Sequence, residues 1–258
     1  MVKKFVMLKK IVIPLPRQHF DPTEVAIPWK ILTQNQVQVI FSTPDGKMPF
    51  CDERMLTGKG LGVFGPLLKA DKNARTTYDE LLKYDGFINP LRWSDILNWE
   101  FDGLLLPGGH DKGMREYLES EALQKIVSIY FESERPVGAI CHGTVLVARS
   151  KGKNGKSVLF GRKTTALLCS QEILAWALTF IWCNDYYRTY SITVEEEVKA
   201  ALGDAADFIK GSLPIFRDSP QKSNRGFALQ DRNYISARWP GDAHAFANKF
   251  LEILLQKC

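Results

Sequence analysis

The sequence predicts a single α/β domain in which helices cover both faces of a parallel sheet. Short apolar runs, such as Lys10 to Pro16 and Gly103 to Leu106, have the length and composition of strands that are buried on both faces. Amphipathic segments such as Met114 to Phe131 alternate with these runs, which is typical of βαβ units. Glycines follow Leu106 where its run ends, and ligands of such sheets bind at that edge.

Composition limits the class of protein. At 258 residues, with 45% hydrophobic and 24% charged residues, the chain can bury one sizeable core. The net charge of +5 is small and its lysines are scattered, so nucleic-acid binding is not indicated. No apolar run approaches the ~20 residues of a membrane helix, and Lys9 and Lys10 interrupt the first one too early for a signal peptide.

The cysteines predict neither a disulfide framework nor a metal site. They are odd in number, widely spaced and without a C-x-x-C pair: Cys51, Cys141, Cys169, Cys183 and Cys258. This usage fits a reducing cytoplasm. We therefore expect a cytoplasmic protein without membrane or nucleic-acid partners and without metal or cofactor.

The helix after the first strand has a well-marked start. Asp21 can be its N-cap, Pro22 suits the first helical position and Glu24 is placed to complete a capping box. Pro28 cannot donate to the Glu24 carbonyl, so the helix should bend behind the strand. The residues leave two roles open for Glu24, a cap or a functional carboxyl.

A second strand is predicted from Gln36 to Thr43, before the turn signal that begins at Pro44. Residues 44–101 have a mixed pattern with a short helix from Thr76 to Tyr84, and their glycine spacings match no phosphate-binding loop. We interpret 44–101 as an insertion or lid. The third strand, Gly103 to Leu106, leads into glycines whose backbone can face a ligand, and Gly109 is a candidate N–H donor.

Cys141 occupies the most informative position. Val137 to Ile140 predicts a buried strand, and a helix can begin at Thr144. The sharp turn between them resembles a nucleophile elbow, which needs small residues two positions before and after the nucleophile; Ala139 and Gly143 supply them. The helix N-terminus should favour the thiolate of Cys141. The alternative is a buried structural cysteine.

His142 and Gly109 complete the chemistry that a cysteine nucleophile requires. The histidine can be the base, or it can orient and pack without taking a proton. Backbone N–H groups of His142 and Gly109 are the candidate oxyanion donors.

The C-terminal half predicts a strand from Ser157 to Leu168, a helix from Gln171 to Ile181, and a helix starting at the acidic run Glu195 to Glu197. The tyrosine-rich tract at 185–190 is better explained by packing over a sheet edge than by ligand contact. Two strand signals, at 227–229 and 234–237, precede a final helix that Asp242 should cap.

Four motifs in this order resemble the ThiJ/PfpI superfamily, within the class I glutamine amidotransferase-like fold. They are Asp-Pro-Thr-Glu at 21–24, Leu-Pro-Gly-Gly-His at 106–110, Ala-Ile-Cys-His-Gly at 139–143 and Ala-Arg-Trp-Pro-Gly-Asp-Ala-His at 237–244. The resemblance implies a flavodoxin-like three-layer sandwich with insertions, and a homodimer. It also implies that Glu24 is protonated and hydrogen-bonds Cys141, which favours catalysis over capping.

Members of this superfamily include glutathione-independent glyoxalases (glyoxalase III), heat-shock chaperones, proposed deglycases and peptidases. The resemblance implies conversion of a 2-oxoaldehyde such as methylglyoxal to a 2-hydroxy acid, with a stress-response holdase, a deglycase or a peptidase-like hydrolase as alternatives. The sequence departs from the family pattern in two ways. The His-x-Glu that glutamine amidotransferases carry downstream of the cysteine is absent, which argues against amide hydrolysis. No clear aspartate is found where the chaperone and peptidase-like branches carry the acid that orients the histidine next to the cysteine. Glu172 and Asp111 are the candidate orienting acids.

Overall fold

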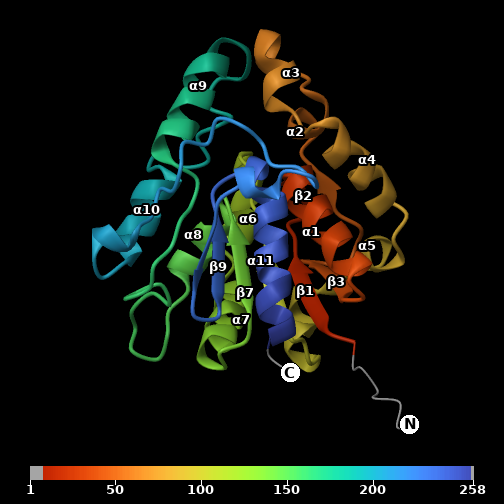
Figure 1. The fold of residues 1–258 in the computed structure, drawn as a ribbon, viewed down its shortest axis with the longest axis vertical. Coiled ribbons are helices and arrows are strands. Elements are labelled where there is room, and N and C mark those ends of the chain that lie inside the picture. Colours follow the sequence, from red (N-terminus) through yellow and green to blue (C-terminus); the bar gives the residue numbers. More distant parts are fainter. Residues whose placement is uncertain (1–7, 257–258) are drawn as a thin grey trace.

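Seven strands form the central sheet of the protein, which we describe from a computed structural model covering residues 8–256 (Figure 1). Their order is β5-β3-β1-β6-β7-β9-β8, and every pairing is parallel except that of β8 with β9. The strands are β1 (Lys10–Pro14), β3 (Gln38–Thr43), β5 (Leu91–Arg92), β6 (Gly103–Leu106), β7 (Val137–Ile140), β8 (Ala228–Asp231) and β9 (Tyr234–Ala237). The α/β flavodoxin-like sandwich predicted from the sequence is confirmed.

Helices lie on both sides of this sheet, because right-handed crossovers run in opposite directions from β1 and β6. On one side α1 (Pro22–Gln34) packs against α11 (Ala243–Gln256), and on the other α7 (Glu121–Glu132) packs against α8 (Gly143–Arg149). The remaining helices are α2 (Glu53–Thr57), α3 (Gly65–Leu68), α4 (Lys72–Leu81), α5 (Asp85–Ile88), α6 (Arg115–Leu118), α9 (Cys169–Cys183) and α10 (Val194–Ala201). Short 3-10 turns join several of them.

The change in crossover direction locates the functional edge of the sheet. β1 connects to β3 on one side, whereas β6 connects to β7 on the other, so the switch point lies between β1 and β6. Ligands of open α/β sheets bind at such a point, beyond the carboxyl ends of the strands. The helix that carries Glu24 follows β1, and the glycines at 108 and 109 follow β6.

The predicted insertion at 44–101 contains β4 (Phe50–Cys51), which pairs with β2 (Gln18–Phe20), and β5, which extends the main sheet beside β3. Its α2 and α3 reach the end of α9 at the top of Figure 1. There Met55 and Leu61 form a small apolar cluster with Cys183, Tyr186 and Tyr187.

Three predicted elements differ from the structure. The predicted helix Met114 to Phe131 is divided, because α6 ends at Leu118 and the Ser120 hydroxyl accepts from Leu123 N to start α7. Residues 157–168 form no strand: β8 already occupies the free edge of β9, and only isolated bridges at Ser157 and Thr164 remain.

Asp242 does not cap the final helix. It ends a 3-10 turn that runs into α11, and its carboxylate is held by Arg238. The cap comes from a distant residue, Asp218, which accepts from Ala245 N at 2.8 Å.

Four of the predicted free cysteines are free in the structure, namely Cys51, Cys141, Cys169 and Cys183; Cys258 and residues 1–7 lie outside the described part. Among the described residues, no helix combines the length and the apolar character needed to cross a bilayer.

Candidate active site

Cys141 lies on the predicted sharp turn between β7 and α8. Its φ is +57°, a left-handed conformation that a non-glycine residue adopts at a cost of about 1–3 kcal/mol and that often marks a functional site. The turn is tight enough that a Cβ on Gly143 would stand 2.2 Å from the Leu106 carbonyl oxygen. The small flanking residues are therefore required by close packing of the turn, and the side chain of Cys141 has no exposed surface.

Glu24 points at this turn and does not complete the capping box. Asp21 caps α1 by accepting from Thr23 N and Glu24 N, whereas Glu24 Oε2 accepts from Gly108 N at 2.7 Å. The Glu24 carboxyl also lies close enough to the Cys141 side chain for each group to affect the pKa of the other. Of the two roles left open, the contacts of Glu24 rule out the reciprocal cap.

Gly108 holds the carboxyl and the elbow together. Its N–H donates to Glu24, and its carbonyl accepts from Asp21 N at 2.9 Å. A Cβ at this position would lie 2.6 Å from His142 N and 3.0 Å from both Cys141 Cβ and Glu24 Oε2. Only glycine leaves these two side chains room to meet.

Burial determines the protonation of this pair. Burial first, and then the charge of Asp21, raise the pKa of Glu24 well above its usual value, and burial raises the pKa of Asp21 to about 6. Burial and the charge of Glu24 also raise the pKa of the Cys141 thiol. The expected thiolate is therefore wrong for the resting site, because desolvation outweighs the helix N-terminus.

The two pKa values are linked. With its proton in place, Glu24 no longer repels a charge on sulfur, and its O–H can donate to Cys141. At rest the Glu24 carboxyl and the Cys141 thiol therefore each keep a proton. This state agrees with the protonated Glu24 that the resemblance implies.

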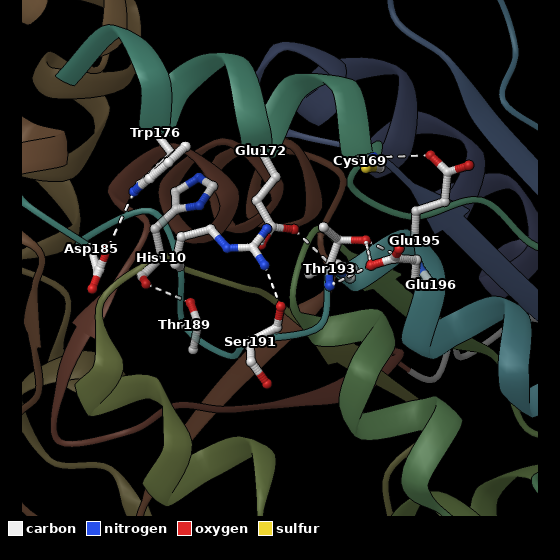
Figure 2. A network of polar contacts seen from close by, with 12 residues as sticks. His110, Cys169, Glu172, Trp176, Asp185, Thr189, Ser191, Thr193, Glu195 and Glu196 are labelled. Carbon is white, nitrogen blue, oxygen red and sulfur yellow. Dashed lines mark hydrogen bonds and ion pairs between the residues drawn. The ribbon is translucent and has the colours of Figure 1, made fainter. Parts of the chain in front are cut away.

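His142 is fixed in one tautomer by Thr189. The Thr189 hydroxyl donates its single hydrogen to the His110 carbonyl at 2.5 Å (Figure 2). It must therefore accept from His142 Nε2, 3.1 Å away. His142 Nδ1 therefore presents its lone pair to Cys141 Sγ, 3.5 Å away. Burial lowers the pKa of His142 well below its usual value, so the ring is neutral and able to accept a proton.

The candidate orienting acids bind elsewhere. Glu172 accepts from Val194 N at 3.0 Å and pairs with Arg188 at 3.5 Å, at the start of α10 (Figure 2). Burial raises the pKa of Glu172 to about 7. Asp111 accepts from Gly113 N and lies 3.6 Å from His19 Nδ1. A hydroxyl, not a carboxylate, is thus the partner of His142 Nε2.

Of the two predicted oxyanion donors, His142 directly follows Cys141, and its backbone N–H lowers the thiol pKa by hydrogen bonding. Gly109 lies next to Asp21, where a Cβ would stand 2.5 Å from the His19 carbonyl oxygen and 3.2 Å from Asp21 N. The oxyanion role of both N–H groups stays a prediction.

Aromatic side chains pack against His142. The His110 ring lies edge-on to His142, with centroids 5.2 Å apart, and against Tyr187 at 4.9 Å. Tyr187 in turn packs against Tyr186 at 4.8 Å. Burial lowers the pKa of His110 to about 4, so the ring next to His142 is neutral.

Three residues of the site escaped the sequence analysis as site residues: Gly108, His110 and Thr189. Gly108 and His110 belong to a recognised motif, and their proximity to Gly109 was the available signal. Thr189 stands in a tyrosine-rich tract interpreted as packing, 47 positions from His142, and nothing local marks its role.

The model of the family described as ThiJ/PfpI family-like matches residues 15–207. The chain belongs to the ThiJ/PfpI family. Its match to this family thus includes the elbow, Glu24 and Thr189, and stops before β8 and β9.

Relatives of this ThiJ/PfpI chain include named enzymes. The glutathione-independent glyoxalase hsp3101 of Schizosaccharomyces pombe is 26% identical over 60% of this chain and 61% of its own length. The deglycase TK1284 of Thermococcus kodakarensis is 26% identical over 60% of this chain and 63% of its own. The crystal structure of glyoxalase III from Candida albicans superposes with a TM-score of 0.68 at 15% identity, covering 95% of this chain and 97% of that one, which shows the same fold.

Proposed function

We propose that this protein is a cysteine-dependent, glutathione-independent glyoxalase that converts 2-oxoaldehydes such as methylglyoxal to 2-hydroxy acids. The observation that carries the proposal is that Glu24 and Cys141, both fully buried at the sheet switch point, converge on Gly108, where a Cβ would stand 3.0 Å from both Glu24 Oε2 and Cys141 Cβ. A thiol that adds to an aldehyde and a carboxyl that carries protons are the two groups this isomerisation requires.

The geometry supports the following sequence of steps. His142 Nδ1 takes the thiol proton while Cys141 sulfur bonds to the aldehyde carbon, and Glu24 gives its proton to the aldehyde oxygen. The Glu24 carboxylate then takes the hydrogen from that carbon, while the protonated His142 gives its proton to the oxygen of the adjacent carbonyl, which forms an enediol. Glu24 returns the hydrogen to the adjacent carbon, and the first hydroxyl gives its proton back to His142, which leaves a thioester. Water cleaves the thioester, which releases the 2-hydroxy acid and restores the thiol. In this scheme the N–H groups of His142 and Gly109 stabilise the oxyanions.

Cys141→Ser is expected to lower kcat/KM for methylglyoxal on the order of 10³-fold or more, because a serine hydroxyl is a far weaker nucleophile beside a neutral histidine. Lactate formation, followed by chromatography, measures this effect. Cys183→Ser is a matched control, because Cys183 is also buried but lies in the cluster with Met55 and Tyr187. Equal lactate formation by wild type and Cys141→Ser would contradict the proposal.

Thr189→Val is expected to lower kcat roughly 10- to 100-fold, because the His142 ring loses the acceptor that keeps its lone pair toward sulfur. Thr189→Ser retains the hydroxyl and should recover most of the activity. If Thr189 is only a packing residue, valine, which is nearly isosteric, will be tolerated better than serine; comparing kcat of the two variants decides between these roles.

A holdase is the second candidate function, because large apolar side chains are exposed around α3 and α9. Val63 and Leu67 are 75% and 69% exposed, and Leu174 and Ile181 are 59% and 84% exposed. Such a surface can bind unfolded clients. Suppression of client aggregation that persists in Cys141→Ser, in protein without aldehyde or glycated-substrate turnover, would favour the holdase over the glyoxalase, the deglycase or a peptidase-like hydrolase. The homodimer and the cytoplasmic location stay predictions.

A further inference from the structure

A cluster of one histidine and two aspartates lies beside the elbow and has no part in the mechanism above. His19 belongs to β2, Asp52 precedes α2 and Asp111 follows β6. One ligand-type atom from each of the three residues lies within 4.8 Å of the others. Three segments that are distant in the sequence thus bring an imidazole and two carboxylates to one point.

The backbone directs His19 toward the two carboxylates. His19 has a φ of +77°, which is uncommon for a residue other than glycine and costs about 1–3 kcal/mol. Its ring rests on Gly113, where a Cβ would stand 2.3 Å from His19 Cδ2. Gly113 N also donates to Asp111 Oδ1 at 2.8 Å, so the same turn seats both side chains.

Asp52 is the buried member of the cluster, with 3% of its surface exposed. Its Oδ1 accepts from Arg54 N at 2.8 Å, and its Oδ2 accepts a short hydrogen bond from the Tyr186 hydroxyl. A carboxylate held in this way by a second residue is typical of metal ligands, whose outer partners fix their orientation. Asp52 also lies close enough to Asp111 to be repelled by its charge, and a cation between them would relieve this repulsion.

We propose that His19, Asp52 and Asp111 bind a divalent transition-metal ion, with Zn²⁺ as the best-suited probe. One imidazole and two carboxylates are ligands of Zn²⁺, whereas Ca²⁺ requires six to eight oxygens. Tetrahedral ligands at about 2.0 Å from the ion are roughly 3.3 Å apart, so side-chain movements of an ångström or two would close the site. The half-exposed side of His19 gives the ion an entry path.

An ion at this site would restrict the aromatic rings that pack against His142. Asp52 is joined through Tyr186 to Tyr187, and Tyr187 packs on His110 above His142. A bound ion would hold His19 of β2 and Asp52, which precedes α2, in fixed positions. Asp52 is in turn hydrogen-bonded to Tyr186, in the segment that follows α9. The proposal does not depend on the reaction at Cys141, because none of the three ligands takes part in it.

Isothermal titration of dialysed protein with ZnCl₂ tests the proposal. We expect one saturable site, and an affinity at least about tenfold weaker in His19→Asn and in Asp111→Asn. Asparagine tolerates the positive φ at position 19 and retains the acceptor for Gly113 N at position 111, so both variants should fold. Tyr186→Phe should weaken binding about 10- to 100-fold by freeing Asp52.

The controls separate this site from other zinc ligands. Asp79→Asn removes an exposed carboxylate on α4 and should leave the affinity unchanged, as should Cys141→Ser. A Co²⁺-loaded sample should show no thiolate charge-transfer band, since the proposed ligands are nitrogen and oxygen. The proposal is overturned if zinc does not saturate one site, if binding is lost in Cys141→Ser, or if His19→Asn and Asp111→Asn bind as wild type.

Discussion

Glu24→Gln should abolish nearly all turnover of methylglyoxal, with kcat/KM lower by about 10²- to 10⁴-fold, and should leave the protein folded. Glutamine can still accept from Gly108 N, and its amide can still donate toward the sulfur, so the contacts that hold the site survive. What it cannot do is release and regain a proton. Loss of activity with retained structure is therefore the signature of an acid–base role.

The same substitution has a predicted effect on stability, and its sign follows from the raised pKa. A group whose pKa is higher in the folded than in the unfolded state stabilises the fold most below its unfolded pKa, about 4.5, and this contribution is lost as pH rises toward the folded value. A glutamine does not titrate and makes no such pH-dependent contribution to the free energy of unfolding. The Glu24→Gln variant should therefore gain stability relative to wild type as pH rises above about 4.5. Urea unfolding at several pH values measures the difference. A wild-type protein that gains relative stability over this range would show that Glu24 is ionised in the fold.

Arg238→Ala should lower the free energy of unfolding by about 3–5 kcal/mol. Both Arg238 and Asp242 are 1% exposed, and two parallel hydrogen bonds of 2.8 and 2.9 Å join the guanidinium to the carboxylate. Arg238 also donates to the carbonyls of Lys210 and Ser212. Its loss leaves a buried carboxylate uncompensated and removes the tie between β9 and the loop before β8.

Lys59→Ala is the control for this effect. Lys59 pairs with Glu53 at 3.5 Å, but their side chains are 77% and 67% exposed, and such surface pairs contribute about 0–1 kcal/mol. Chemical denaturation of both variants at one pH compares them directly. A change below about 1 kcal/mol for Arg238→Ala would mean that Asp242 becomes protonated or hydrated at little cost.

The parts of the fold that the sequence predicts well are those determined by burial. Gly103–Leu106 and Val137–Ile140 are completely buried strands with the predicted bounds, because strands covered on both faces must be apolar throughout. The predicted strand at 157–168 fails for a reason that no local pattern contains. Leu159 and the run from Ala166 to Leu168 are buried, but whether a segment pairs depends on which strand edges remain free, and β8 closes that edge.

The candidate site also has features that the sequence predicts and features that it does not. The elbow at Cys141 is visible in the sequence because the turn imposes small neighbours, and Glu24 is visible because it belongs to a motif next to a strand end. The hydroxyl of Thr189 and the desolvation that raises the Cys141 pKa arise from packing between distant segments. The helix dipole inferred from the strand–turn–helix pattern alone therefore predicts a lowered pKa for the Cys141 thiol, whereas burial raises it.

The complete burial of the elbow cysteine also affects what solution measurements report. Since Cys141 has no exposed surface, an aldehyde can reach it only in the fraction of molecules in which the surrounding side chains have moved. The apparent dissociation constant for substrate then equals the intrinsic one divided by that fraction, so a well-formed site can still have a high KM. The same population sets the rate at which oxidants reach the sulfur. The buried thiol would thus be oxidised more slowly than the same thiol in a molecule in which it is exposed.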